Sequence, residues 1–258
     1  IRFRLLIHYD GGAFHGWQLQ PDVATVQGEL EDVLRRISGA RRRVLASGRT
    51  DTGVHATGQV ATVDLPGDRW TAPRLRGALN ALLPDAIWIE AVEVAPDGFH
   101  PRFDARARTY QYRVGTSPRA RSPFHRPWCW ALGEDLDTDV MTRGSAHLVG
   151  DHSFRAFAKA GQPERGERCL VHSAEWTRWP EMGWIFTIRA NRYLHHMVRY
   201  IVGTLVDMGR GRRPVSDLPS LLAGTGSELV TSPPAPPQGL FLTRVEYDPE
   251  SSPSMDHP

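Results

Sequence analysis

The residues best suited to do chemistry lie in segment 47–65, SGRTDTGVHATGQVATVDL. Arg49 and Asp51 stand between two glycines, Gly48 and Gly53, and the alternating apolar residues that follow are typical of a strand. A guanidinium and a carboxylate in one tight loop could form a catalytic site. The strands on either side would hold these two groups in fixed positions, as a catalytic site requires. A purely structural turn is the alternative, because aspartate often binds backbone amides within a turn and glycine adopts the unusual dihedral angles.

The tripeptide Asp51-Thr52-Gly53 raises a protease as another alternative, because aspartic proteases carry Asp-Thr-Gly and need two such carboxylates that share a proton. Here the pattern occurs once, since the Asp-Gly pairs at 10–11 and 97–98 lack it. A homodimer could supply a second copy, but 258 residues is long for that arrangement. Asp51 also follows Arg-Thr, where a protease usually has apolar residues, so the protease hypothesis is disfavoured.

Two tyrosines, Tyr110 and Tyr112, lie in the predicted strand RARTYQYRV and share one of its faces, because side chains two positions apart point the same way. Arginines flank them at positions 106, 108 and 113. An aromatic face among arginines can stack on bases and contact phosphates, as recognition of unpaired RNA requires. Half-buried strand tyrosines without such a role remain an open alternative.

Arg199 is a candidate because of its position on the predicted helix 193–209. The main apolar stripe of that helix consists of Met197, Ile201, Leu205 and Met208. Arg199 lies off this stripe, where a solvated arginine is the simplest interpretation, yet Val202 and Val206 share its side. This pattern predicts a part-buried guanidinium, which needs a carboxylate partner.

Other kinds of site are disfavoured by residue type and spacing. His195 and His196 are adjacent and therefore point about 100° apart on a helix, which does not suit two ligands of one metal ion. The single lysine, Lys159, leaves only one candidate for Schiff-base chemistry. Cys129 and Cys169 are too few for a disulfide framework or a cysteine-based zinc site.

The arginines are concentrated in two blocks, although the net charge of the chain is only +2. Residues 100–130 hold seven arginines and one acid, and residues 186–213 hold six arginines and one acid. Such blocks indicate a surface that binds a polyanion. Simple solvated arginines in an arginine-rich chain are the alternative.

The length of 258 residues suits one large domain or two of ordinary size. No apolar run approaches the roughly 18 residues that a membrane helix needs. The first residues, IRFRLLIHYD, do not resemble a signal peptide. We therefore expect a cytoplasmic protein without a membrane partner.

The first half of the chain predicts the element order βαββαβ, as in the ferredoxin-like fold. Its strands are expected at 2–10, 42–47, 58–65 and 87–95, and its helices at 25–40 and 72–83. The second half repeats the order, with strands at 107–115, 170–178, 183–190 and 240–247 and helices near 135–148, 193–209 and 215–223. In that half the turn WPEMG takes the place of the Arg-Thr-Asp loop, so the chemistry was placed in one copy only.

We therefore expect an α+β fold of two tandem ferredoxin-like halves, 1–104 and 105–248, that form a continuous, mostly antiparallel sheet with a central cleft. The last residues, 249–258, are expected to be disordered.

Taken together, these motifs resemble those of the tRNA pseudouridine synthase A family, whose signature loop is similar to GRTDTGVHATGQV. The other matching segments are YDGGAFHGWQ (9–18), TVQGELE (25–31), LNALLP (79–84), FHPRFDARARTYQYRV (99–114), GDHSFRAF (150–157), ANRYLHHMVRYIVG (190–203) and QGLFL (238–242). Several independent motifs in the family's order make the resemblance specific.

The resemblance implies a homodimer with a positively charged RNA-binding cleft, which isomerises uridine to pseudouridine at positions 38–40 of the tRNA anticodon stem-loop. It implies no metal and no cofactor, nucleotide cofactors included. By the same resemblance, Asp51 is the catalytic aspartate, Tyr110 stacks on the target base and Arg199 pairs with the aspartate. Arg49 holds and flips the RNA, and Leu240 lines the pocket.

Two departures from the family are visible. Thr52 replaces an alanine that many relatives carry, for which we expect little effect, and segment 159–169 matches poorly, which leaves its contacts with tRNA open. A non-catalytic tRNA-binding or chaperone module is the main alternative of another class, because it would use the same basic cleft without needing Asp51.

Overall fold

The computed structural model describes residues 1–67, 69–159, 166–224 and 229–248. By compactness the chain divides into a first unit, Ile1–Ala107 with the residues from Leu242 onward, and a second unit, Arg108–Phe241. The expected halves, 1–104 and 105–248, were drawn from the order of elements and stay a prediction. The expected disordered tail, 249–258, lies outside the described residues.

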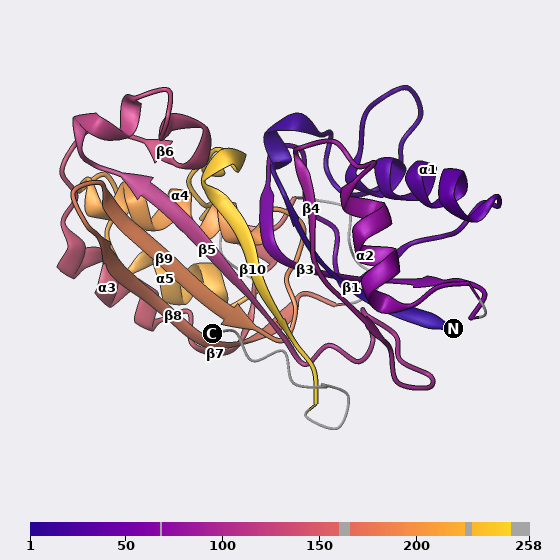
Figure 1. The fold of residues 1–258 in the computed structure, drawn as a ribbon. Helices are drawn as coiled ribbons and strands as arrows, with labels where there is room; N and C mark the ends of the chain where they lie inside the picture. The colour runs from indigo at the N-terminus through magenta and orange to yellow at the C-terminus, as the bar shows by residue number, and fades with distance from the viewer. Residues whose placement is uncertain (68, 160–165, 225–228, 249–258) are drawn as a thin grey trace. The chain divides into compact units, whose positions relative to one another are not determined.

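The first unit contains the predicted βαββαβ order. Its elements are β1 (Arg2–Tyr9), α1 (Val26–Ser38), β2 (Leu45–Ala46), β3 (His55–Asp64), α2 (Ala72–Asn80) and β4 (Ile87–Val94), with a 3-10 turn at Gly11–Ala13. Strand β10 (Leu240–Glu246), the last one in the described residues, pairs next to β3; the strand order here is β4-β1-β3-β10, and β2 pairs with β3. β1 runs antiparallel to both β3 and β4, and α1 and α2 pack against each other (Figure 1).

Local signals account for α1. The Thr25 hydroxyl accepts a hydrogen bond from the Gly28 amide at 3.2 Å and so caps the first turn. Gly39 ends the helix in the left-handed conformation, with φ 73°, which glycine adopts at low cost. The predicted helix therefore has nearly the expected bounds.

The second strand is shorter than the predicted 42–47. The Val44 amide donates to the Glu31 carboxylate of α1 at 3.0 Å, and its carbonyl accepts from the Gln27 side chain at 3.4 Å. Since helix side chains bind both polar groups of Val44, only Leu45–Ala46 pairs with β3.

In the second unit the strands follow the order β5-β9-β8-β7. Its strands are β5 (Ala107–Gly115), β6 (Trp130–Ala131), β7 (Gly150–Ser153), β8 (Arg168–Trp179) and β9 (Gly183–Ala190), and its helices are α3 (Thr138–Ala146), α4 (Met197–Gly209) and α5 (Asp217–Leu222). All pairs are antiparallel except that of β6 with β5. The two short strands β6 and β7 were not expected. Short 3-10 turns lie at Pro118–Arg121, Arg126–Trp128, Arg155–Phe157 and Pro237–Gly239.

Helix α4 begins at Met197, whereas the sequence predicts a start at 193. His196 precedes it with φ 63°, a left-handed conformation that interrupts a helix. The predicted stripe of α4 is buried, and α4 packs on α3, where Gly144 gives room to Leu205. In Figure 1 these helices lie behind β5, β9 and β8.

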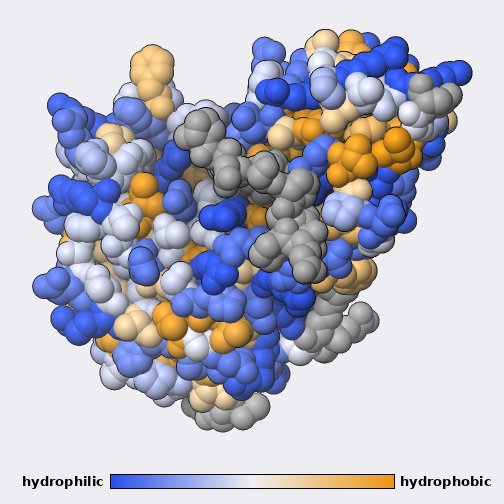
Figure 2. Space-filling model, turned by 60° about the horizontal axis from the view of Figure 1, so that its bottom comes forward, coloured by the Kyte–Doolittle hydropathy of each residue, from blue (hydrophilic) through white to orange (hydrophobic). Residues whose placement is uncertain are grey.

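The expected fold class is confirmed: the chain is a mixed α+β protein with mostly antiparallel strands. Among the described residues no helix has the length and apolar character needed to cross a membrane. The face shown in Figure 2 is mainly hydrophilic, with its hydrophobic residues in separate groups.

Candidate active site

The loop that carries Asp51, residues 47–54, connects β2 to β3 in the first unit. The backbone of Asp51 closes a turn, because its carbonyl accepts from the Val54 amide at 3.1 Å. Gly53 has φ 78°, as a turn glycine requires. Within the loop Asp51 is half-buried, Thr50 is buried, and Arg49 is exposed. The predicted turn with its glycine is therefore present, and the Arg49 side chain in it is exposed to solvent.

A buried hydrogen-bond network lies under this loop. The hydroxyl groups of Tyr9 and Thr50 are 2.7 Å apart. The Gln59 amide donates to the Gly48 carbonyl at 2.9 Å, and its oxygen accepts from the Ser47 hydroxyl at 2.8 Å. Since these four side chains are almost fully buried, each bond is shielded from water and expensive to break. The backbone before Asp51 is thus anchored to β1 and β3.

Two glycines of segment 9–18 allow that segment to pack closely against the backbone of the loop 47–54. A Cβ on Gly16 would lie 2.8 Å from the Thr50 carbonyl oxygen and 3.2 Å from the Thr52 nitrogen. A Cβ on Gly11 would lie 2.0 Å from the Val54 carbonyl oxygen. The Trp17 amide donates to the Thr50 carbonyl at 3.0 Å. Segment 9–18 therefore packs directly on the loop backbone, where side chains would not fit.

These supporting residues were not predicted from the sequence. Tyr9, Ser47 and Gln59 are common in ordinary strands and turns, and only their occurrence in the quoted motifs YDGG, SGRTD and GQV linked them to the loop. Their contact is long-range, since 50 positions separate Tyr9 from Gln59.

Tyr110 lies on β5 of the second unit, half-buried, opposite Ile188 of β9. Its ring meets the ring of Tyr193 edge-on, with centroids 4.9 Å apart and planes at 79°. The Tyr193 hydroxyl donates toward the carbonyls of Arg108 (3.0 Å) and Ile188 (2.9 Å). Burial raises the pKa of Tyr193 well above its ordinary value, so its hydroxyl stays protonated and can donate to these carbonyls. These bonds fix the Tyr193 ring, against which the Tyr110 ring packs.

Tyr112, on the same face of β5, is a core residue. Its side chain is fully buried, and its hydroxyl donates to the Pro236 carbonyl at 2.7 Å. Gly239 approaches the ring so closely that a Cβ there would lie 2.6 Å from its Cζ. For Tyr112 the alternative of a structural strand tyrosine is therefore correct.

The three arginines that flank these tyrosines already have partners within the protein. Arg106 binds the carboxylate of Asp248, which raises the pKa of Arg106 and lowers that of Asp248. Arg108 donates to the Asn191 carbonyl at 3.0 Å. Arg113 packs its guanidinium over the Phe241 ring at 4.2 Å, and burial lowers its pKa. Arg113 is therefore a half-buried guanidinium that packs on an aromatic ring.

Arg199 is half-buried on α4, as its flanking valines predict. Its Nε donates to the Ala235 carbonyl at 2.7 Å, and its own carbonyl accepts from the Ala235 amide at 2.9 Å. These bonds fix the guanidinium, while the expected pairing with a carboxylate stays a prediction. Leu240 is buried at the start of β10.

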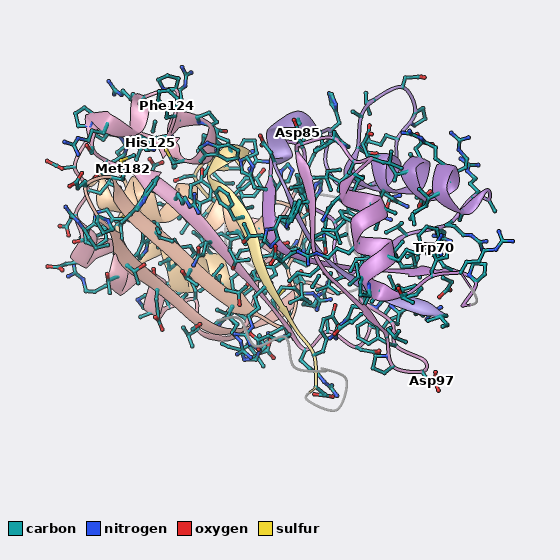
Figure 3. The ribbon with its side chains drawn as sticks, viewed as in Figure 1. Trp70, Asp85, Asp97, Phe124, His125 and Met182 are labelled. Atoms are coloured by element: carbon teal, nitrogen blue, oxygen red, sulfur yellow. The ribbon has the colours of Figure 1, made fainter. Side chains whose placement is uncertain are left out.

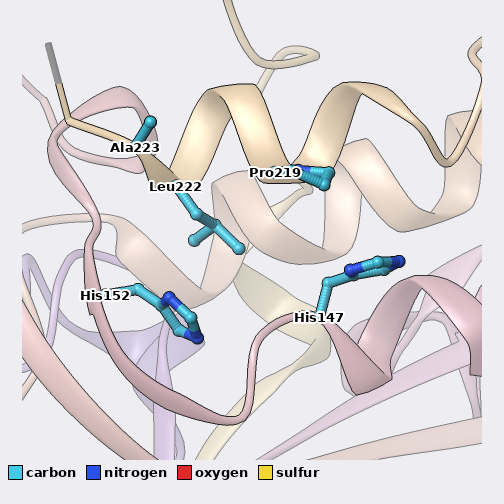
Figure 4. A pocket seen from close by; sticks show the side chains of 5 residues that line it. All are labelled: His147, His152, Pro219, Leu222 and Ala223. Atoms are coloured by element: carbon cyan, nitrogen blue, oxygen red, sulfur yellow. The ribbon is translucent and has the colours of Figure 1, made fainter.

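The structure thus brings Arg49 and Asp51 into one loop of the first unit and places Tyr110, Arg199 and Leu240 in the second unit. The meeting of the two groups of residues stays a prediction. A pocket of about 260 Å³ in the second unit is lined by none of the five. Its lining consists of His147, His152, Pro219, Leu222 and Ala223 (Figure 4).

Comparison with known proteins gives a consistent result. The family model described as tRNA pseudouridine synthase matches residues 5–104 and 145–248. The chain belongs to the tRNA pseudouridine synthase family. Like other tRNA pseudouridine synthases, it is an isomerase that acts on tRNA.

Individual relatives support the same assignment across nearly the whole chain. The tRNA pseudouridine synthase A of Moorella thermoacetica is 41% identical over 95% of this chain and 98% of its own length. That of Myxococcus xanthus is 41% identical over 95% and 92%, and that of Halalkalibacterium halodurans is 42% identical over 94% and 91%. The resemblance found in the sequence motifs is thereby confirmed.

Four of the five predicted site residues of this tRNA pseudouridine synthase lie in the matched ranges, whereas Tyr110 lies between them.

Proposed function

We propose that this enzyme converts uridine to pseudouridine in the anticodon stem-loop of tRNAs, at positions 38–40, and that Asp51 is its catalytic carboxylate. The main support is the way Asp51 is held. It is a half-buried carboxylate at a turn whose preceding backbone is anchored by the buried side chains of Ser47, Thr50 and Gln59. A reacting group needs such fixed support, because small displacements cost much of the rate.

The reaction sets clear demands on the site. The glycosidic C–N bond breaks, the uracil turns, and a C–C bond forms at the same ribose carbon. The base and the sugar must not diffuse apart, so the site must close around them. The target base must also leave its stack, at a cost of roughly a few kcal/mol.

The proposed roles follow from these demands. Asp51 acts in its ionised form, as a nucleophile on sugar or base or as a base toward a ribose proton, and a nearby Arg199 would favour that form. Tyr110 stacks on the free uracil and can take part in removal of the C5 proton. Its ring is held by Tyr193, which supports a stacking role.

The remaining roles concern the RNA. Arg49 is exposed beside Asp51, as a group that holds the flipped strand would be. Leu240 contributes an apolar wall. This chemistry needs no metal and no cofactor. We further propose a homodimer in the cytoplasm, which sedimentation and fractionation would test.

The test is the conversion of unmodified tRNA by purified Asp51→Asn. We expect turnover to fall by at least about 1,000-fold, because an amide can neither attack nor accept a proton, while tRNA binding persists. Mapping the pseudouridines made by the wild type locates the target positions.

Asp97→Asn is the matched control, since Asp97 is an exposed carboxylate of the first unit that also lies close to a glycine in the sequence, Gly98 (Figure 3). Its variant should convert tRNA at the wild-type rate. Turnover by Asp51→Asn at a rate close to that of Asp97→Asn would contradict the assignment. A wild-type protein that binds tRNA without converting it would support the non-catalytic module instead.

A further inference from the structure

The basic loop, residues 117–128 with the sequence SPRARSPFHRPW, has no role in the proposed active site. It contains three arginines and no acid, and it belongs to the second unit. It also falls between the ranges that the family model matches.

The tip of the basic loop exposes an aromatic ring. The side chain of Phe124 is 81% exposed, the highest value for a large hydrophobic residue in the described part of the chain. Figure 3 shows Phe124 beside His125 at the outer end of the loop, above Met182. A single exposed apolar residue is common on protein surfaces. A function for Phe124 therefore has to be inferred from the residues around it.

The loop is built rigidly. The Ser122 carbonyl accepts from the amides of His125 (2.9 Å) and Arg126 (2.8 Å), and the Cys129 thiol donates to the His125 carbonyl at 3.3 Å. Burial raises the pKa of Cys129 to about 11, so this donor stays protonated. The tip therefore projects from a fixed backbone.

The base of the loop is a small apolar cluster. Ala120, Cys129 and Met182 are buried together. Gly115 leaves room for this packing, since a Cβ there would lie 2.2 Å from the Cβ of Ala120. The exposed position of Phe124 is thus specified by the packing below it.

The arginines of the loop carry net positive charge. Arg119 is paired with Glu181, while Arg121 donates to the Leu132 carbonyl at 2.9 Å, a bond that leaves its charge uncompensated. In the part of the chain that the structure describes, neither Arg121 nor Arg126 forms an ion pair. Glu134, which follows the loop, is engaged by Arg210.

An exposed ring among arginines fits a nucleic acid better than a protein surface. Bases and ribose rings stack on aromatic side chains, and guanidinium groups bind phosphates. The substrate of this enzyme is a tRNA, a polyanion much larger than one flipped nucleotide, so contacts away from the reacting uridine are expected.

We propose that the basic loop is a second contact surface for tRNA. Phe124 stacks on a base or ribose, and Arg121 and Arg126 contact backbone phosphates. This inference rests on tRNA as the substrate and is independent of the role of Asp51.

The test measures binding of unmodified, full-length tRNA to the whole protein over a range of salt concentrations. Phe124→Ala should raise Kd about tenfold, the usual scale for loss of one stacked base. The double variant Arg121→Ala/Arg126→Ala should reduce the slope of log K against log salt by about 1.5, since each phosphate contact contributes about 0.7 to 0.9. All altered side chains are exposed, and unchanged thermal melting would verify folding.

Two control variants lie in the first unit. Trp88→Ala removes another exposed aromatic ring, and Arg36→Ala another exposed arginine. Both should leave Kd and the salt slope near wild type. The proposal is overturned if the loop variants bind like wild type, or if the controls lose as much. Dissociation of an oligomer by Phe124→Ala with unchanged tRNA binding would also overturn it, because the ring would then serve a second copy of the chain.

The two proposals fail separately. Turnover by Asp51→Asn would reject the catalytic role and leave the loop measurements intact. Unchanged binding by the loop variants would reject the second contact and leave the role of Asp51 intact.

Discussion

Two turns of the chain, the loop 47–54 between β2 and β3 and the turn 180–182 between β8 and β9, differ in the residues that support them. The loop 47–54 of the first unit rests on buried polar side chains, Tyr9, Ser47, Thr50 and Gln59. The turn 180–182 of the second unit joins β8 to β9. Its own residue Met182 is buried and packs with Ala120 and Cys129.

The two kinds of support constrain a turn differently. Hydrogen bonds are directional, so a polar network fixes the backbone of Gly48 and Thr50 at particular atoms. Apolar packing under the other turn stabilises without fixing a direction. The second turn carries Glu181 at φ 61° instead of an Arg-Thr-Asp sequence. If Asp51 has the proposed catalytic role, the polar support under its turn would hold the reacting carboxylate in a fixed position.

The largest effect should follow from Gln59→Leu. The change removes the hydrogen bonds that this fully buried side chain forms with the Ser47 hydroxyl, the Gly48 carbonyl and the Tyr9 hydroxyl, so each of these buried groups loses a polar partner. Unfolding free energy should fall by about 2 to 5 kcal/mol, because each unsatisfied buried group costs about 1 to 3 kcal/mol. Urea denaturation measures the loss, and kcat at saturating tRNA should fall with it.

Gln111→Leu, at a half-buried glutamine of β5, serves as the control and should change stability little. A Gln59→Leu protein with wild-type stability would show that the network does not hold the loop.

A matched pair of tyrosine variants compares the units directly. Tyr9→Phe and Tyr112→Phe each delete one hydroxyl at a 2.7 Å hydrogen bond, to Thr50 in the first unit and to Pro236 in the second. Each should cost about 1 kcal/mol of stability. Only Tyr9→Phe should lower kcat, since its bond supports the backbone next to Asp51. Equal kcat values for the two variants would contradict a positioning role for Tyr9.

The buried thiols of the second unit should make stability depend on alkaline pH. Cys129 and Cys169 are both free and buried, and burial raises the pKa of each to about 11. Unfolded thiols lose their proton near pH 8.5, so between that pH and about 11 the folded state binds more protons. Stability therefore falls as pH rises through this window.

Melting temperatures at neutral and alkaline pH measure the effect. The double variant Cys129→Ala/Cys169→Ala should show a smaller alkaline decline than the wild type. An identical decline would assign the effect to other groups.

The smallest effect is expected at the turn of the second unit. Glu181→Gln releases Arg119 from its ion pair on an exposed surface, where such pairs contribute little stability. The freed arginine should strengthen tRNA binding slightly and steepen the salt slope by at most about 0.9. A weaker complex would count against the basic loop as a tRNA contact.

Short-range signals account for the features that the sequence predicts well. The cap at Thr25, the glycine at position 39 and the apolar stripe of α4 act within a few residues, so their pattern predicts α1 and most of α4. The turn glycine Gly53 and the half-buried state of Arg199 belong to the same class.

Long-range contacts decided the features that the sequence did not predict, such as the burial of Tyr112 and the length of β2. Tyr110 and Tyr112 are equivalent in the strand pattern, yet the approach of Gly239, more than a hundred positions away, makes only Tyr112 a core residue. Strand β2 is short for a similar reason, because the Val44 amide donates to the Glu31 carboxylate of α1 and not to a neighbouring strand.

The amino-acid sequence alone was therefore enough to determine the fold class, the family and the candidate Asp51, because these depend on local patterns and on motifs quoted in order. Only the tertiary structure revealed the network of Tyr9, Ser47, Thr50 and Gln59 beneath that aspartate and the packed base beneath Phe124. The physical reason is that burial and hydrogen-bond partners are properties of contacts between distant segments, which no single segment specifies.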